Sequence, residues 1–184
     1  TTCTLTEVSV KRGVLAEGDN LTITDSVAGL RVNGANAVVD LKNSTITGVR
    51  DNGVTQTNGT VTLTNVTIDS PTNYGATVSG GTIALNSVTI NNPKNKDGIS
   101  ISGGAAFLNG VTVNAPKNNG ITVSGGSITG KNVVLESVTG YGLYIDKNAG
   151  DVSVDGLKVN ASGSTVANVN ISAEQADYKG SVTL

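Results

Sequence analysis

Carboxylates are the side chains of this sequence that come nearest to a catalytic site. The 184 residues include 14 Asp and Glu but no His, the side chain that enzymes use most often as a general acid or base. A pair of carboxylates can cleave a glycosidic bond when the two groups lie about 5–5.5 Å or about 6.5–9.5 Å apart. The pairs to test are Asp69 with Glu136 and Asp51 with Asp97. Their separation depends on the elements that carry them.

A repeat of about 22 residues sets the spacing of these elements. Three consecutive units read VTIDSPTNYGATVSGGTIALNS (66–87), VTINNPKNKDGISISGGAAFLNG (88–110) and VTVNAPKNNGITVSGGSITGKN (111–132). A proline and a following glycine recur at the same place in each unit, as Pro71 and Gly75 in the first, Pro93 and Gly98 in the second, and Pro116 and Gly120 in the third. A period this regular indicates a solenoid in which each unit is one turn.

Alternation of apolar and polar residues predicts three short strands in each unit. In the first unit they are Val66–Ile68, Ala76–Val78 and Ile83–Leu85. Strands this short, joined by tight turns, favour an all-β, right-handed parallel β-helix of about seven coils, each of roughly 22 residues and three strands. We expect a single domain over 1–184, with a partial coil at 1–20, regular coils over 21–160 and an irregular coil at 161–184.

This arrangement argues against catalysis by either carboxylate pair. Asp69 and Glu136 fall three coils apart, about 14 Å, which exceeds both glycosidase spacings. Asp51 and Asp97 fall two coils apart in corresponding loops, near 10 Å, and each stands beside a turn glycine where Asp is a common turn former. A Ca²⁺ site would need six to eight oxygen ligands. We therefore expect no catalytic residue, no metal and no cofactor.

Composition narrows the possible partners. Charged residues are 14% of the chain and the net charge is −2, which favours neither nucleic acid nor an anionic membrane as a partner. No apolar run approaches the roughly 20 residues of a membrane-spanning helix. The sequence opens TTCTL without Met, so we expect either a processed mature protein, which we favour, or a fragment. Its one cysteine, Cys3, is interpreted as a small buried side chain, with an intermolecular or lipid-modified thiol as the alternatives.

Several outward positions differ from the polar pattern around them. Phe107 replaces Ala84 and Thr62 on the outer side of the third strand and suggests a contact patch. Tyr144 is outward by the same register, and a sugar could stack on its ring. A basic stripe along the first loop includes Lys94 and Lys117 together with Arg50 and Lys96. Phe107 is a candidate for a subunit or partner interface, with packing beneath a loop as the alternative. Tyr144 and the basic stripe are candidate contacts with host or matrix glycans, and the alternative for the lysines is that they keep the sheet soluble.

Other residues that recur at the same place in successive coils indicate structural roles. Outward threonines recur at Thr22, Thr45, Thr67, Thr89 and Thr112, where β propensity and cross-strand pairing explain them better than ice binding. Asparagines near the end of successive coils, Asn43, Asn65 and Asn132, with Asn86 and Asn109 one place earlier, could pass amide hydrogen bonds between coils. Gln56 occupies an inward position, which predicts a bulge or an internally bonded amide.

The two ends of the predicted β-helix indicate that copies of the chain assemble with one another. An open β-helix leaves unpaired strand edges at each end, and no amphipathic helix precedes the first coil to cover them. The stretch 172–180 could form a small cap at the other end. Strand-like positions at the two ends, Val8 and Val10 at one and Val182 and Leu184 at the other, are the candidate assembly residues. Head-to-tail stacking through them would produce an open filament.

The repeat resembles that of right-handed parallel β-helix proteins, especially the passenger domains of bacterial autotransporter adhesins of the pertactin-like type. The segments GYGLYIDKNAGDVSVDGLKV (140–159) and NNGITVSGGSITGKNVVL (118–135) carry this resemblance, which covers residues 21–160. It implies an extracellular or cell-surface protein. The chain lacks an outer-membrane barrel and is shorter than most such passengers.

The sequence thus favours a non-enzymatic, extracellular structural or adhesive solenoid. Two versions fit, a filament subunit that assembles with itself end to end and an adhesin passenger. The alternative is a polysaccharide-binding or polysaccharide-cleaving β-helix module of the lyase or phage-tailspike type.

Overall fold

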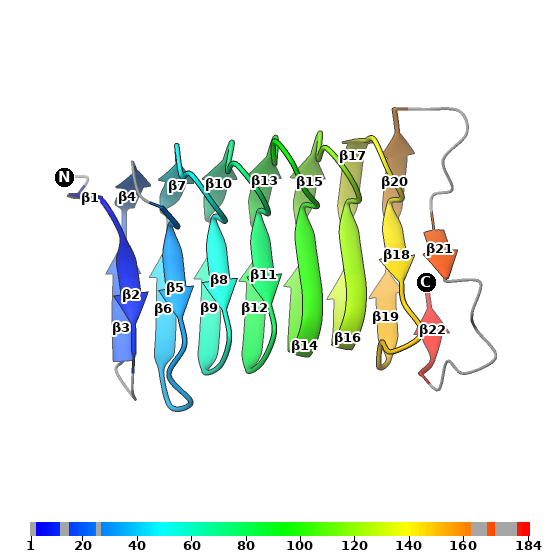
Figure 1. Ribbon diagram of the computed structural model, residues 1–184, viewed down its shortest axis with the longest axis horizontal. Helices are drawn as coiled ribbons and strands as arrows, with labels where there is room; N and C mark the ends of the chain where they lie inside the picture. Colours follow the sequence, from blue (N-terminus) through cyan, green and yellow to red (C-terminus); the bar gives the residue numbers. More distant parts are fainter. Residues whose placement is uncertain (1–2, 12–14, 25–26, 163–168, 172–179) are drawn as a thin grey trace.

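The repeat folds into a parallel β-solenoid. The computed structural model describes residues 3–11, 15–24, 27–162, 169–171 and 180–184, without the side chains of 15 and 16. All regular elements in these ranges are strands, and they stack into an elongated prism of about seven turns (Figure 1). This confirms the predicted fold class and the repeat of about 22 residues.

The prism has three long faces, which we call faces A, B and C, and each turn of the chain crosses them in that order. Face A consists of β1 (Cys3–Leu5), β4 (Leu21–Thr24), β7 (Thr45–Thr47), β10 (Thr67–Asp69), β13 (Thr89–Asn91), β15 (Thr112–Asn114), β17 (Val134–Val138) and β20 (Lys158–Ala161). Face B consists of β2 (Val8–Val10), β5 (Leu30–Val32), β8 (Val54–Gln56), β11 (Ala76–Val78), the first parts of β14 (Ile99–Asn109) and β16 (Ile121–Lys131), β18 (Leu143–Ile145) and β21 (Val169–Ile171). Face C consists of β3 (Leu15–Asp19), β6 (Val38–Lys42), β9 (Thr60–Thr64), β12 (Thr82–Asn86), the second parts of β14 and β16, β19 (Val152–Asp155) and β22 (Val182–Thr183).

Two coils depart from the expected three separate strands. In β14 and β16 the chain passes from face B to face C without a break in strand pairing, so one strand of 11 residues serves both faces. The bend lies at Gly103–Gly104 and Gly125–Gly126, where the register between β14 and β16 shifts. The Gly-Gly turn that the sequence indicated is therefore a bend within a strand in these coils.

Equivalent residues of successive coils lie directly above one another. On face A, Ile68 pairs with Ile46 below and Ile90 above, and the outward column places Thr67 between Thr45 and Thr89. This confirms the predicted threonine row. Inward columns form one aliphatic core along the prism, and many of its residues, Leu85 and Ile90 among them, are fully buried. The narrow interior explains why the chain has a single Phe and no Trp.

Residues in the left-handed backbone conformation turn the corners of the prism. Before face A they are Asn20, Asn43, Asn65, Ser87, Gly110, Asn132 and Gly156, and at its far end Gly48, Ser70, Asn92, Ala115 and Ser137, the last at the register shift within β17. Glycine and asparagine tolerate this conformation, whereas a residue such as Ala115, with a φ of 48°, adopts it at a cost. Of the asparagines singled out in the sequence, Asn43, Asn65 and Asn132 are thus turn residues, whereas Asn86 and Asn109 end strands β12 and β14.

Side-chain amides join some of the coils. Asn65 Nδ2 donates to Asn43 Oδ1 at 3.1 Å, which confirms the predicted amide link at that corner for this pair. Gln56 keeps the register of its neighbours Val32 and Val78 and is 1% exposed. Its Nε2 donates to Gly59 O at 2.9 Å and Thr82 O at 3.0 Å. Of the two explanations for Gln56, the internally bonded amide is confirmed.

Candidate functional surfaces

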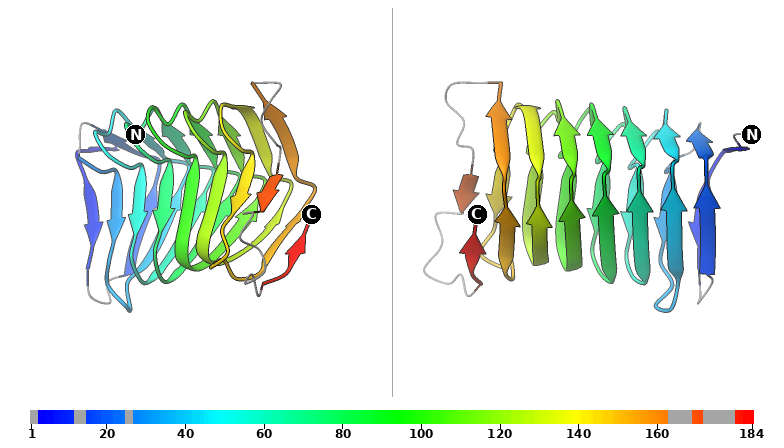
Figure 2. Two further views of the ribbon diagram at one scale, coloured as in Figure 1. Left: turned by 45° about the vertical axis from the view of Figure 1, so that its right-hand side comes forward. Right: turned by 180° about the vertical axis from the view of Figure 1, so that it is seen from behind.

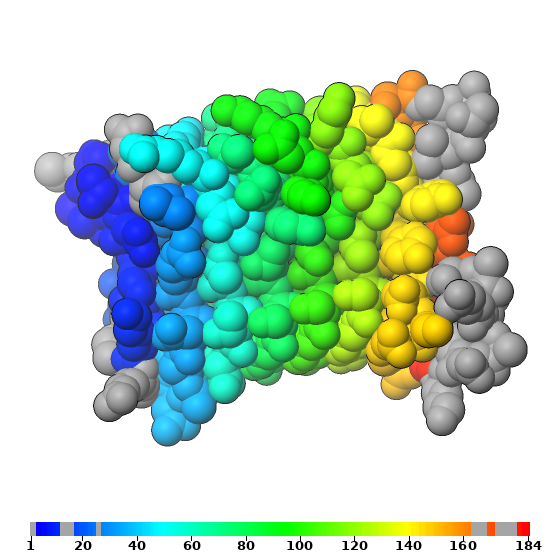
Figure 3. Space-filling view, viewed as in Figure 1, coloured from blue at the N-terminus to red at the C-terminus, as the bar shows by residue number. Residues whose placement is uncertain are grey.

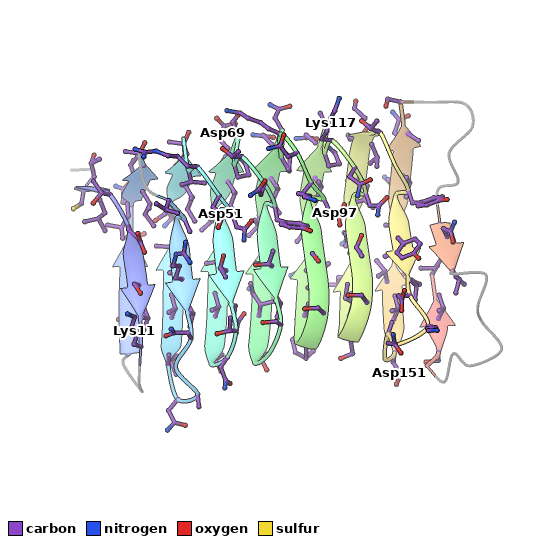
Figure 4. The ribbon with its side chains drawn as sticks, viewed as in Figure 1. Lys11, Asp51, Asp69, Asp97, Lys117 and Asp151 are labelled. Atoms are coloured by element: carbon purple, nitrogen blue, oxygen red, sulfur yellow. The ribbon has the colours of Figure 1, made fainter. Side chains whose placement is uncertain are left out.

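The structure keeps the two carboxylate pairs apart. On face A, Asp69 and Glu136 share one outward column, with Asn91 and Asn114 between them. Figure 4 shows Asp51 and Asp97 along the same edge of the prism, in the turn between faces A and B. Their positions in that turn differ, because Asp97 directly precedes its turn glycine and Asp51 stands two residues before Gly53.

Asp97 supports the turn between faces A and B. It is 5% exposed, and its Oδ1 accepts hydrogen bonds from Asn118 Nδ2 at 2.6 Å and from the Asn119 backbone N–H at 3.0 Å. Asn52 and Asn119 each accept the equivalent hydrogen bond from a backbone N–H of the next coil. Burial, followed by the negative charge of Asp97, raises the pKa of the Tyr74 hydroxyl above its ordinary value. Asp97 therefore serves as a link between coils, in a position that Asn fills in other coils.

The basic stripe is part of the same edge. The backbone N–H groups of Lys94 and Lys117 donate to Pro71 O and Pro93 O at 3.0 and 3.1 Å, so the two lysines occupy one column above the buried prolines. Both lysine side chains and those of Arg50 and Lys96 are exposed. Lys96 belongs to a neighbouring column, since its carbonyl accepts from Asn118 N–H. The stripe is thus one column that contains Arg50, Lys94 and Lys117, with Lys96 beside it, at the A–B edge.

Phe107 lies on the outer side of face C, as predicted, paired with Ala84 and Thr129. It is 48% exposed and borders a shallow hollow of about 210 Å³. The other lining residues are Asn86, Leu108, Asn109, Thr129, Gly130 and Lys131. Gly130 interrupts an inward leucine column at this level, opposite Leu108. An exposed aromatic ring, two amides and a lysine therefore gather at one place on face C.

Tyr144 has an aromatic neighbour that the sequence did not indicate. It pairs with Thr122 on the outer side of face B. Tyr141, from the preceding turn, stacks on it with ring centroids 5.7 Å apart and an interplanar angle of 26°. Figure 3 shows this side of the prism as a continuous wall without a deep hollow over its coloured residues. The tyrosine pair is therefore a surface platform.

Among the described residues, no further coil covers the core at the first-coil end of the prism. Val8 is partly buried and Val10 is buried, so of the two predicted assembly residues Val8 is the more accessible. Beside Val8 lies a cavity of about 160 Å³, lined mainly by aliphatic side chains: Leu5, Val8, Leu21, Ile23, Leu30, Val39 and Leu41, with Gly18, Glu17 and Asp40. In this end coil, β1, β2 and β3 each pair with only one strand among the described residues.

The last coil presents the opposite edges. Here β20, β21 and β22 contribute one strand to each face, and among the described residues each has a single strand partner (Figure 2). Val182 is partly buried, and Leu184 is 55% exposed. Asp151 fastens this coil, because its Oδ1 accepts from the Ser181 backbone N–H at 2.8 Å and from Ser181 Oγ at 3.0 Å. These two bonds, the backbone one first, lower the pKa of the Asp151 carboxyl.

Some functional candidates lie outside what the repeat indicated. Cys3 is exposed in β1, in contrast to the expected buried side chain, because its inward column has no coil beyond it among the described residues. Gly18 was not singled out, although it replaces leucine in the inward column that contains Leu41 and Leu63. Comparing each end coil with the consensus of the middle coils would have identified both positions. The possible cap at 172–180 falls almost wholly outside the described residues.

No family model, curated protein or solved structure matches this chain. In the described ranges no group of three or more Cys, Asp or Glu side chains is placed to hold a metal ion. The same ranges contain no helix long and apolar enough to cross a membrane.

Proposed function

We propose that this chain is a non-enzymatic, extracellular structural protein whose copies stack end to end into a surface filament. The observation that carries the proposal is the pair of end coils. Each end presents one strand on each face, and the aliphatic columns of the core reach both ends. A second copy would continue the same parallel pairing and the same columns.

Energetics support this contact. Successive coils inside the chain bury their aliphatic side chains almost completely, whereas Leu5, Val8, Val159, Val169 and Val182 at the ends are only partly buried. Burial of an aliphatic side chain stabilises by about 1.5–3 kcal/mol. An end-to-end contact would recover part of this burial energy for several residues at once. It would also give a second strand partner to end strands that have only one among the described residues.

The adhesin passenger is the related version of this proposal. In that version the same stacked coils form the shaft of a longer surface protein, and the exposed side chains of the shaft contact host or matrix glycans. Both versions use the solenoid as a rigid spacer, and neither requires catalysis.

Two variants, each blocked at one end of the prism, test head-to-tail assembly when they are studied alone and as a mixture. Val8→Lys places a charge at one end and Val182→Lys places a charge at the other. Each variant alone should remain monomeric in analytical ultracentrifugation at concentrations where the unaltered chain forms filaments. An equimolar mixture should form dimers, because one open head meets one open tail. Monomers of the unaltered chain at every concentration would contradict the proposal, and so would an unchanged filament in both variants.

The second candidate function is the binding of an acidic polysaccharide on face C. The observation that favours it is the exposed Phe107 beside Asn86, Asn109 and Lys131, because aromatic rings, amides and a cation suit the faces, hydroxyls and carboxylates of uronic acids. Binding of oligogalacturonate measured by calorimetry, lost in Phe107→Ala and kept in Thr62→Ala, would support this function. No heat of binding in the unaltered chain would remove it.

A further inference from the structure

We propose that the end contact has one register, in which Leu184 of one copy enters the apolar cavity at the first coil of the next copy. This inference rests on the proposed end-to-end assembly. It adds which face of one copy continues which face of the next, and which side chain lies at the centre of the contact.

The alignment follows from one inward column on face C. Strand pairing places Gly18, Leu41, Leu63, Leu85, Leu108, Gly130 and Val154 one above another. Val152 pairs with Val182 and Ser153 with Thr183, so the next step brings Leu184 opposite Val154. When this column continues into a second copy, the residue that follows Leu184 is Gly18.

The cavity beside Gly18 suits a large side chain from outside. At Gly18 itself the inward space is taken by neighbouring leucines, because a Cβ there would lie 2.7 Å from Leu21 Cδ1 and 2.8 Å from Leu41 Cδ1. The cavity beside Gly18 has about 160 Å³. An apolar cavity of about 150 Å³ can hold a benzene-sized group. Leu184 is the most exposed large hydrophobic side chain among the described residues.

Charge along the outward columns is compatible with this alignment. Continuing each face places Lys158 over Thr4, Asn170 over Ser9 and Thr183 over Glu17 of the next copy. None of these pairs brings two like charges together, which would oppose the contact.

Disulfide trapping tests the alignment. Val134 pairs with Lys158, so position 157 would lie over Cys3 of the next copy, one strand spacing of about 4.8 Å away and within the Cα range of about 4.4–6.8 Å for a disulfide. Under mild oxidation by copper phenanthroline, Leu157→Cys should give a ladder of cross-linked species. Asn170→Cys, on face B of the same end, should give almost none, because in this alignment it lies over Ser9.

The two cysteine variants separate this inference from the proposed function. Each is imaged before oxidation, and Leu157→Cys is repeated in a Cys3→Ser background, where the ladder should disappear. Filaments that cross-link through position 170, or through neither position, would contradict the register while leaving end-to-end assembly intact. Unaltered chains that form no filaments would contradict both.

A matched pair of surface variants tests the contact itself. Leu184→Lys removes the side chain from the cavity, whereas Thr60→Lys places the same charge at an exposed position in the middle of the prism. We expect Leu184→Lys to raise the critical concentration for assembly at least about tenfold and Thr60→Lys to leave it unchanged. Equal critical concentrations for Leu184→Lys and the unaltered chain would overturn the inference.

Discussion

The middle coils and the end coils share one repeat but differ in what covers their apolar columns. In the middle, each inward side chain has a coil on both sides, and Leu85 is fully buried. At the ends, the same columns finish at partly buried residues such as Leu5 and Val159. The difference shows that the coils gain most of their stability from their neighbours, as expected for a solenoid.

The largest effect should come from shortening a leucine in the middle coils. Leu85→Ala should lower the free energy of unfolding by about 2–5 kcal/mol, because it opens a cavity in a closed column. Leu5→Ala, the same change at an end, should cost the monomer less than about 1 kcal/mol, since Leu5 is only partly buried there. Urea denaturation of dilute monomers measures both. Equal losses would remove the distinction between middle and end coils.

A middle-size effect is expected at a strained corner. Ala115 is exposed and has a φ of 48°, so Ala115→Gly should stabilise the chain by about 1 kcal/mol by relieving the left-handed backbone conformation. Ala105, in the extended part of β14, provides the control. There the same change should destabilise by about 0.5–1 kcal/mol, because glycine loses more freedom in a strand. The two melting temperatures should therefore shift in opposite directions, and parallel shifts would contradict the account of the corner.

The smallest effect concerns the fastening of the last coil. The folded-state pKa of Asp151 is lowered, so its hydrogen bonds to Ser181 are fully present above the ordinary aspartate pKa of about 3.9 and are lost as the pH falls through the lower value. The Ser181 amide resonance should therefore titrate with a midpoint below about 3.9. Asp151→Asn should abolish this titration. A midpoint above 3.9 in the unaltered chain would contradict the assignment.

Much of the fold could be predicted from sequence because a solenoid repeats its constraints. Pro71, Pro93 and Pro116 occupy the same place in three consecutive coils. The alternation of apolar and polar residues around Ile68 and Ile90 defines the register of the strands. The continuous strands β14 and β16 could not be predicted, because a Gly-Gly pair is compatible with a turn and with a bend.

The candidate surfaces were harder to predict. The outward position of Phe107 followed from register, and the structure confirms it. The stacking of Tyr141 on Tyr144 did not, because it depends on the path of a turn that has no strand periodicity. The cavity beside Gly18 was also missed, since it depends on how Leu5, Val8 and Leu21 pack in a coil that has no coil beyond it among the described residues.

The axial rise of the assembled chain tests the central claim most directly. In the described ranges face A has eight strands, and continuous stacking at about 4.8 Å per strand predicts a rise of about 38 Å per subunit. Cryo-electron microscopy of the purified chain should therefore show filaments with a 4.8 Å layer spacing that continues through each junction and a subunit repeat near 38 Å. Monodisperse particles at millimolar concentration, or filaments whose layer spacing breaks at every junction, would contradict end-to-end stacking.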